Sequence, residues 1–85
     1  MSDSELKSLP NIGDKLLELF DLIDIKSPEQ LKNLGAESVF IKIRTIEPDA
    51  CLSKLNAIEG AIQGIRWHKL NQQRKLELKA FFDRL

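Results

Sequence analysis

The chain has 85 residues, of which 42% are hydrophobic and 31% are charged. These values are ordinary for one small folded domain, and they exclude a disordered polar tail, a coiled-coil rod and a collagen-like repeat. Thirteen basic side chains balance thirteen acidic ones, so no overall positive field draws the protein to nucleic acid or to an anionic membrane. The apolar runs are far shorter than the ~20 residues of a membrane span, and the N-terminus does not resemble a signal peptide. We therefore expect a cytoplasmic protein with no membrane partner.

The supply of chemically reactive side chains is small. The sequence holds one His, one Cys, one Trp and no Tyr. General bases, activated nucleophiles and metal ligands are drawn mainly from such residues, and no pair of carboxylates is singled out by its spacing. A single cysteine cannot form an internal disulfide, which agrees with a reducing compartment. We expect no enzyme, no metal, no cofactor and no small-molecule substrate.

In chain order, the first strong helical pattern covers residues 13–23. Its apolar positions follow the i, i+3, i+4, i+7 spacing of one helical face and are Leu16, Leu19, Phe20 and Ile23. A second helix is predicted from Pro28 to Leu34, with Ser27 as N-cap and Gln30 as its capping-box partner. Gly35 can adopt the positive φ that ends this helix.

Three further helices are predicted in the rest of the chain. Residues 36–47 carry an apolar stripe formed by Val39, Phe40, Ile43 and Ile46. The β-branched residues of 39–46 leave a strand open as the alternative. Pro48 is expected to open the next helix and Gly64 to end it, with a buried arc formed by Cys51, Leu55, Ile58 and Ile62. A reactive thiol is the alternative interpretation of Cys51. The last helix begins at the N-cap Asn71 and buries Leu78, Phe81, Phe82 and Leu85.

Together these segments predict an all-α protein, a single compact domain of about five helices over residues 1–85, with residues 1–4 disordered. Glu59 is expected to be partly buried, with an internal ion pair or hydrogen bond. A stripe of small side chains follows the fourth helix and comprises Ser53, Ala57, Gly60, Ala61 and Gly64. Because a mid-helix glycine costs about 1 kcal/mol relative to alanine, Gly60 indicates close approach of another helix, which makes the fourth helix the central element. Trp67 is interpreted as a clasp over the core whose indole N–H reaches a carbonyl, or alternatively as a binding anchor. His68 is expected at the surface.

The segment Leu9–Gly13, followed by Asp14, resembles the turn of a helix-hairpin-helix motif. In that family the turn's backbone N–H groups and the start of the second helix hold a DNA phosphate. Asn11 replaces the first glycine; it tolerates positive φ, but its side chain would stand where a phosphate approaches. The candidate contact residues of this hairpin are Asn11, Ile12, Gly13 and Lys15. Residues 31–35 repeat part of the pattern of 9–13, which admits a tandem hairpin.

Over about residues 5–83 the chain resembles the C-terminal domain of the TfoX/Sxy proteins, bacterial regulators of natural competence. The resemblance rests on LPNIG (9–13), DIKSPEQLKNLGAE (24–37), LNAIEGAIQGIRWHKL (55–70) and RKLELKAFF (74–82), in this order and spacing. It implies a compact all-helical domain with a helix-hairpin-helix-like N-terminal portion, a role linked to transcriptional control, and no catalytic activity.

The charges are unevenly distributed along the chain. Residues 1–37 have a net charge of −4 and residues 38–85 a net charge of +4. Because the hairpin lies in the acidic half and Asp14 stands at the helix start, we expect the hairpin to be a structural turn rather than a strong DNA-binding site. The basic surplus lies near the C-terminus, at Arg66, His68, Lys69, Arg74, Lys75 and Lys79. This basic face is either a solvated helical surface or a contact surface for an acidic partner or nucleic acid.

Two functions therefore remain, and a small enzyme has no residue set to support it. The first is a non-catalytic interaction module that docks onto another protein as a monomer or weak dimer. The alternative is a weak nucleic-acid-binding domain that contacts the DNA backbone. The candidate residues for the basic contact face are Arg66, Lys69, Arg74, Lys75 and Lys79.

Overall fold

The computed structural model describes residues 2–85, with the side chains of residues 5–85. Its elements are α1 (Ser2–Lys7), α2 (Asp14–Leu22), α3 (Pro28–Arg44), α4 (Leu52–Gln63), the short 3₁₀ helix η1 (Trp67–Lys69) and α5 (Gln72–Asp83). No strand occurs in residues 2–85, so the all-α prediction is confirmed and the strand alternative for residues 39–46 is wrong. The expectation that residues 1–4 are disordered falls partly outside the described residues, because Met1 and the side chains of residues 2–4 are not described. The backbone of residues 2–4 belongs to α1.

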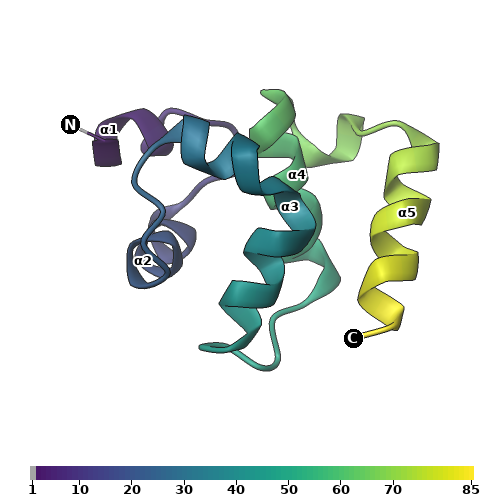
Figure 1. Cartoon of the computed structure of the whole chain (residues 1–85). Helices are drawn as coiled ribbons and strands as arrows, with labels where there is room; N and C mark the ends of the chain where they lie inside the picture. The colour runs from purple at the N-terminus through teal and green to yellow at the C-terminus, as the bar shows by residue number, and fades with distance from the viewer. Residues whose placement is uncertain (1) are drawn as a thin grey trace.

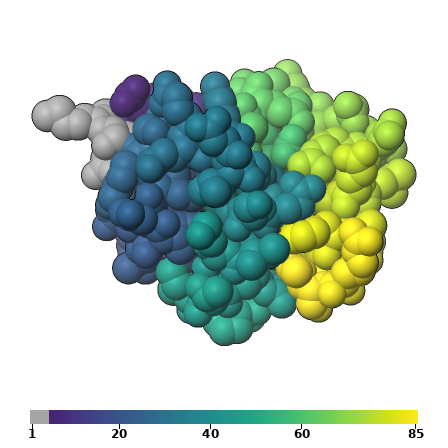
Figure 2. All heavy atoms as spheres, viewed as in Figure 1, coloured from purple at the N-terminus to yellow at the C-terminus, as the bar shows by residue number. Residues whose placement is uncertain are grey.

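The helices are arranged around α4. Figure 1 shows α3 crossing the middle of the molecule, with α2 on one side of it and α5 on the other. Helix α4 packs against α3, η1 and α5, which confirms the predicted central position of this helix. On the face shown in Figure 2, the side chains of α3 fill the space between α2 and α5.

The predicted apolar stripes form the core, with three exceptions. The fully buried side chains include Phe20, Leu31, Val39, Phe40, Ile43, Leu55, Ile58 and Leu78. Ile46 is 42% exposed because α3 ends at Arg44, before the stripe reaches it. Leu85 is 50% exposed because α5 ends at Asp83. The prediction of a buried Cys51 is also wrong, since this residue is exposed.

The start of α3 follows the sequence pattern closely. The Oγ of Ser27 accepts a hydrogen bond from the backbone N–H of Gln30 at 3.2 Å, and the Gln30 side chain accepts one from the backbone N–H of Lys26. Gly35, at φ 82° and ψ 159°, breaks the helical geometry where the first helix was predicted to end. The two predicted helices are therefore two halves of one kinked element. The tandem-hairpin prediction is wrong, because residues 31–34 are helical whereas residues 9–13 form a turn.

Helix α4 begins at Leu52 rather than at Pro48. The intervening residues form a turn in which the N–H of Ala50 donates to the carbonyl of Glu47 at 3.0 Å. A guanidinium N–H of Arg44 donates to the carbonyl of Ala50, also at 3.0 Å, and ties this turn to the end of α3. Cys51 consequently becomes the N-cap in an extended conformation, which keeps its thiol outside the core. At the other end, Gly64 adopts the left-handed conformation, at φ 75°, that was expected to stop the helix.

Candidate functional site

The hairpin residues have distinct environments. Asn11 has a left-handed backbone, with φ of 69°, as the substitution of asparagine for glycine allows. The side chain of Ile12 is only 9% exposed and belongs to the core. Gly13 is the extended N-cap of α2, and Lys15 extends into solvent with 73% of its side chain exposed. Ile12 thus anchors the centre of the turn in the core, whereas Lys15, just after the turn, is exposed to solvent.

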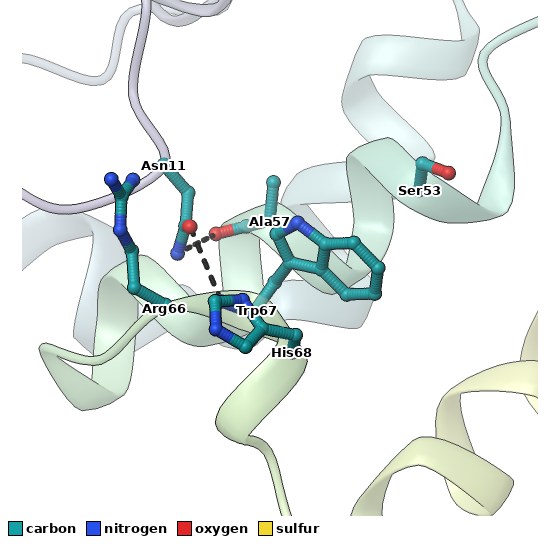
Figure 3. Close-up of a pocket in the computed structure, with 6 residues that line it drawn as sticks. All are labelled: Asn11, Ser53, Ala57, Arg66, Trp67 and His68. Carbon is teal, nitrogen blue, oxygen red and sulfur yellow. Dashed lines mark hydrogen bonds between the residues drawn. The ribbon is translucent and has the colours of Figure 1, made fainter.

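The side chain of Asn11 makes the most informative contacts in the chain. Its Nδ2 donates to the carbonyl of Ile65 at 2.9 Å and, at a longer 3.4 Å, to that of Ala57. Its Oδ1 accepts the backbone N–H of Trp67 at 3.2 Å; Figure 3 shows the amide directed toward α4 and the turn that follows it. The Asn11 amide is therefore engaged with the protein's own backbone. It joins the hairpin to a turn more than 50 residues away in sequence.

Gly60 lies directly beneath these contacts. A Cβ atom at this position would lie 2.5 Å from Asn11 Nδ2, 2.8 Å from the carbonyl oxygen of Ile65 and 3.1 Å from the Cα of Trp67. The predicted close approach of another backbone is confirmed, but the neighbour is the turn that leads into η1 rather than one of the long helices. The glycine is required because the turn folds back onto α4.

Two adjoining cavities form an open groove beside this junction. The first, of about 440 Å³, is lined by Asn11, Ser53, Ala57, Arg66, Trp67 and His68 (Figure 3). The second, of about 330 Å³, is lined by Asn11, Gly13, Lys15, Leu16, Cys51, Ser53, Lys54 and Ala57. Because both include Asn11, Ser53 and Ala57, we describe them together as the Asn11 groove. The fold thus brings hairpin residues and Arg66 of the basic face to one surface.

Some groove residues were not predicted as contacts. Lys54, Ser53 and Ala57 come from one face of α4. The small side chains at positions 53 and 57 are the sequence signal for this surface, because they leave room above the helix. In the sequence alone, the same small side chains indicate only a packing stripe.

Trp67 lies at one end of the groove with 43% of its surface exposed. Its ring meets that of His68 edge-on, with 6.0 Å between centroids. Among the described residues the indole N–H has no hydrogen-bond partner, so the predicted clasp onto a carbonyl is wrong. His68 is exposed, as expected.

The remaining residues of the predicted basic face lie outside the groove. Lys75 donates from Nζ to the carbonyl of His68 at 3.2 Å, and Lys79 pairs with Asp83 at 2.9 Å. Lys69 is exposed at the end of η1. The face predicted from sequence is therefore divided: Arg66 and His68 line the groove, Lys69 is exposed, Lys75 and Lys79 make local contacts, and Arg74 belongs to an internal network.

That network is centred on Arg74. Its guanidinium donates to both carboxylate oxygens of Glu37 at 2.9 Å, to Glu59 at 2.9 Å and to Glu77 at 3.2 Å. Glu59 is 7% exposed and also accepts from Gln63, so the predicted internal ion pair is confirmed. The hydrogen bonds from Arg74 hold the pKa of Glu37 below its usual range, and those to Glu37 and Glu59 raise the pKa of Arg74. Arg74 thus joins α3, α4 and α5 and is engaged within the protein.

The electrostatics of the groove favour anions. Its charged lining residues are Lys15, Lys54 and Arg66, and no carboxylate lines it among the described residues. Glu47, outside the lining, pairs with Lys54 and lies 4.0 Å from Lys15. A separate acidic cavity on α2 is lined by Asp14, Leu17, Glu18 and Asp21 and shares no lining residue with the groove.

The described residues contain no group of three or more His, Cys, Asp or Glu side chains placed to hold a metal ion. No described helix combines the length and apolar character needed to cross a membrane. The groove offers cationic and apolar contacts around a fixed backbone junction, which suits binding.

Comparisons with known proteins identify relatives that match most of the chain. The family model for the TfoX C-terminal domain matches residues 2–82. A crystal structure of an uncharacterized protein from Listeria monocytogenes is 45% identical, with a TM-score of 0.87 over 89% of this chain and 86% of that one. A second, of a protein of unknown function from the same organism, is 42% identical, with a TM-score of 0.89 over 92% of this chain and 96% of that one. No curated protein matches.

Proposed function

The chain belongs to the TfoX C-terminal domain family, and from this premise we propose that it is a non-catalytic interaction module that docks onto a partner protein in bacterial transcriptional control. The observation that carries this proposal is the Asn11 groove, in which an exposed Trp67 stands beside a backbone junction held by three hydrogen bonds. Exposed tryptophan is typical of the energetic centres of protein interfaces. A surface fixed in this way needs little ordering when a partner binds.

Weak DNA binding by the hairpin is the second candidate. Gly13 and Lys15 open onto the groove that Arg66 also lines, which is the observation in its favour. Against it, the exposed Asp14 stands in the chain between the groove residues Gly13 and Lys15, and duplex DNA presents about one charge per 1.7 Å of its axis. A long polyanion at the hairpin would therefore also meet this carboxylate.

The basic face gives the DNA alternative little further support. Arg74 is committed to Glu37 and Glu59, and Lys79 is paired with Asp83. Non-specific DNA affinity comes mainly from cations that are free to neutralise phosphates. We expect any duplex binding to be weak and to have a shallow dependence on salt.

Two measurements on the full chain test the proposed function. Tagged protein is used to capture partners from nuclease-treated cytoplasmic extract of its source, and the intact chain is titrated with duplex DNA at two salt concentrations. We expect a defined protein to be retained after nuclease treatment, and Trp67→Ala to release it while Leu76→Ala, at an exposed apolar position outside the groove, does not. Retention that requires nucleic acid, or tight duplex binding abolished by Gly13→Val, would contradict protein docking.

A further inference from the structure

Resting on the proposed function, we propose that the Asn11 groove binds a short acidic segment of the partner protein, one that carries an apolar side chain between its carboxylates. The groove has both kinds of contact. Its cations come from α2, α4 and the turn after α4, at Lys15, Lys54 and Arg66. Its apolar surface is formed by Trp67, Ala57 and Leu16.

Charge complementarity favours a negatively charged ligand in the groove. Three cations line the groove, and Glu47 is the carboxylate that contacts two of them. Lys15 remains 73% exposed and its contact with Glu47 is long, at 4.0 Å, so it is available to a ligand. A basic segment would bring like charges onto these side chains, which is unfavourable.

The surroundings select a short segment over a nucleic acid. Asp14 is exposed at the start of α2, between the groove residues Gly13 and Lys15 in the chain, and Glu18 and Asp21 follow on the same helix. A peptide can place a few carboxylates beside Lys15 and Arg66 and then leave the surface. A duplex cannot avoid the neighbouring carboxylates, because its charge is continuous.

The rigidity of the site supports binding of a flexible partner segment. Asn11 ties the hairpin to the backbone at positions 65 and 67, and Gly60 allows that turn to sit directly on α4. The walls of the groove are therefore fixed relative to one another before a ligand arrives, and the ordering cost falls on the partner segment.

The protein contains its own reporter for the test. Trp67 is the single tryptophan of a chain without tyrosine, so intrinsic emission reports on the groove alone. The intact chain is titrated, at low salt, with a short synthetic peptide in which Glu and Asp alternate with Leu. A matched peptide with Gln and Asn in place of the acids, and a short DNA duplex, are titrated in parallel.

We expect the acidic peptide to change Trp67 emission with saturation, and the neutral peptide to bind at least about tenfold more weakly. Arg66→Gln and Lys15→Gln should each lower the affinity for the acidic peptide by about three- to fivefold. Lys32→Gln is the matched control, because Lys32 is an exposed lysine that does not line the groove. It should leave the affinity unchanged.

Several results would overturn the inference. Equal binding of the two peptides, or a response insensitive to Arg66→Gln and Lys15→Gln, would remove the role of charge. If the duplex binds more tightly than the acidic peptide and is weakened by the same two variants, the occupant of the groove is nucleic acid. If Trp67 emission changes with protein concentration alone, the occupant is a second copy of the chain. If capture of a partner protein persists but is insensitive to these variants, the groove inference fails and the proposed function stands. If no protein is captured, the proposed function itself fails.

Discussion

Asn11 offers the sharpest test of how the hairpin is used. The Asn11→Gly variant keeps a residue that accepts positive φ but removes the side chain that bonds to Ile65, Ala57 and Trp67. Two of these bonds have ordinary lengths, 2.9 Å and 3.2 Å, and the third is long, at 3.4 Å. A typical net contribution of about 1 kcal/mol per bond gives a loss of about 2–3 kcal/mol. The greater backbone entropy of glycine in the unfolded chain is offset by the relief of the strain that asparagine carries at φ 69°, so the lost hydrogen bonds set the net effect.

The assay is equilibrium unfolding in urea followed by circular dichroism, with a thermal melt in parallel. In a domain of this size each kcal/mol corresponds to a shift in Tm of about 4–8 °C, so Asn11→Gly should melt about 8–24 °C below the wild type. The Asn11→Asp variant distinguishes the contribution of the donating Nδ2 group from that of the accepting Oδ1 atom. It keeps the acceptor for the N–H of Trp67 but places a carboxylate oxygen against the carbonyl of Ile65.

We expect Asn11→Asp to destabilise at least as much as Asn11→Gly at neutral pH, because a lost donor there becomes a repulsion between oxygens. Asn33→Ala serves as the control, since Asn33 is exposed on α3 and lies away from the junction. Its free energy of unfolding should stay within about 0.5 kcal/mol of the wild type. If both Asn11 variants also stay within that range, the side chain does not hold the hairpin to α4.

Three further outcomes are expected. Gly60→Ala should lower the free energy of unfolding by about 2–4 kcal/mol in urea titrations, because the new Cβ would meet the Ile65 carbonyl at 2.8 Å; the gain of about 1 kcal/mol typical of alanine in a helix would show that no such contact exists. Cys51 should react with a thiol reagent in the folded state, and Cys51→Ser should stabilise the protein by about 0.5–1 kcal/mol by supplying the N-cap hydrogen bond that α4 lacks; a thiol that reacts only on unfolding would contradict its exposure. Because Arg74 lowers the folded-state pKa of Glu37, this carboxylate contributes stability above its unfolded pKa of about 4.3 and loses it as the pH falls through the lower folded value. Urea titrations between about pH 6 and 3 should therefore show a smaller loss of stability in Glu37→Gln than in the wild type, and parallel curves would refute this role.

The N-caps and helix-ending glycines followed from the sequence because each depends on neighbours within one turn of chain. Ser27 and Asn71 cap the helices they were expected to cap, and Gly35 and Gly64 adopt positive φ where the helical pattern stops. The buried stripes of α2, α3 and α5 followed from periodicity for the same reason. The positive φ of Asn11 could also be predicted from the sequence, because asparagine tolerates the left-handed backbone conformation better than most residues.

Where periodicity failed, a contact outside the helix decided the outcome. The apolar arc that included Cys51 assumed a helix beginning at Pro48, whereas a turn held by Arg44 delays the start to Leu52. The basic face assumed that every cation on or near α5 points to solvent. Arg74 instead turns inward, because Glu59 is buried on α4 and needs a partner.

The sequence by itself thus determined the all-helical class, the segments that form α2, α3, α4 and α5, and most of the core, since those depend on interactions between residues a few positions apart; its predicted helices did not include α1 (Ser2–Lys7) or η1 (Trp67–Lys69). Only the tertiary structure decided the surface. The partners of the Asn11 side chain lie 46 to 56 positions away, and Arg74 reaches Glu37 across 37. Which polar side chains meet over such separations is set by how the buried faces pack together, and a one-dimensional pattern carries no record of that packing. The meeting of Lys15, Lys54 and Arg66 in one groove is therefore a property of the fold, although each residue belongs to a locally predictable segment.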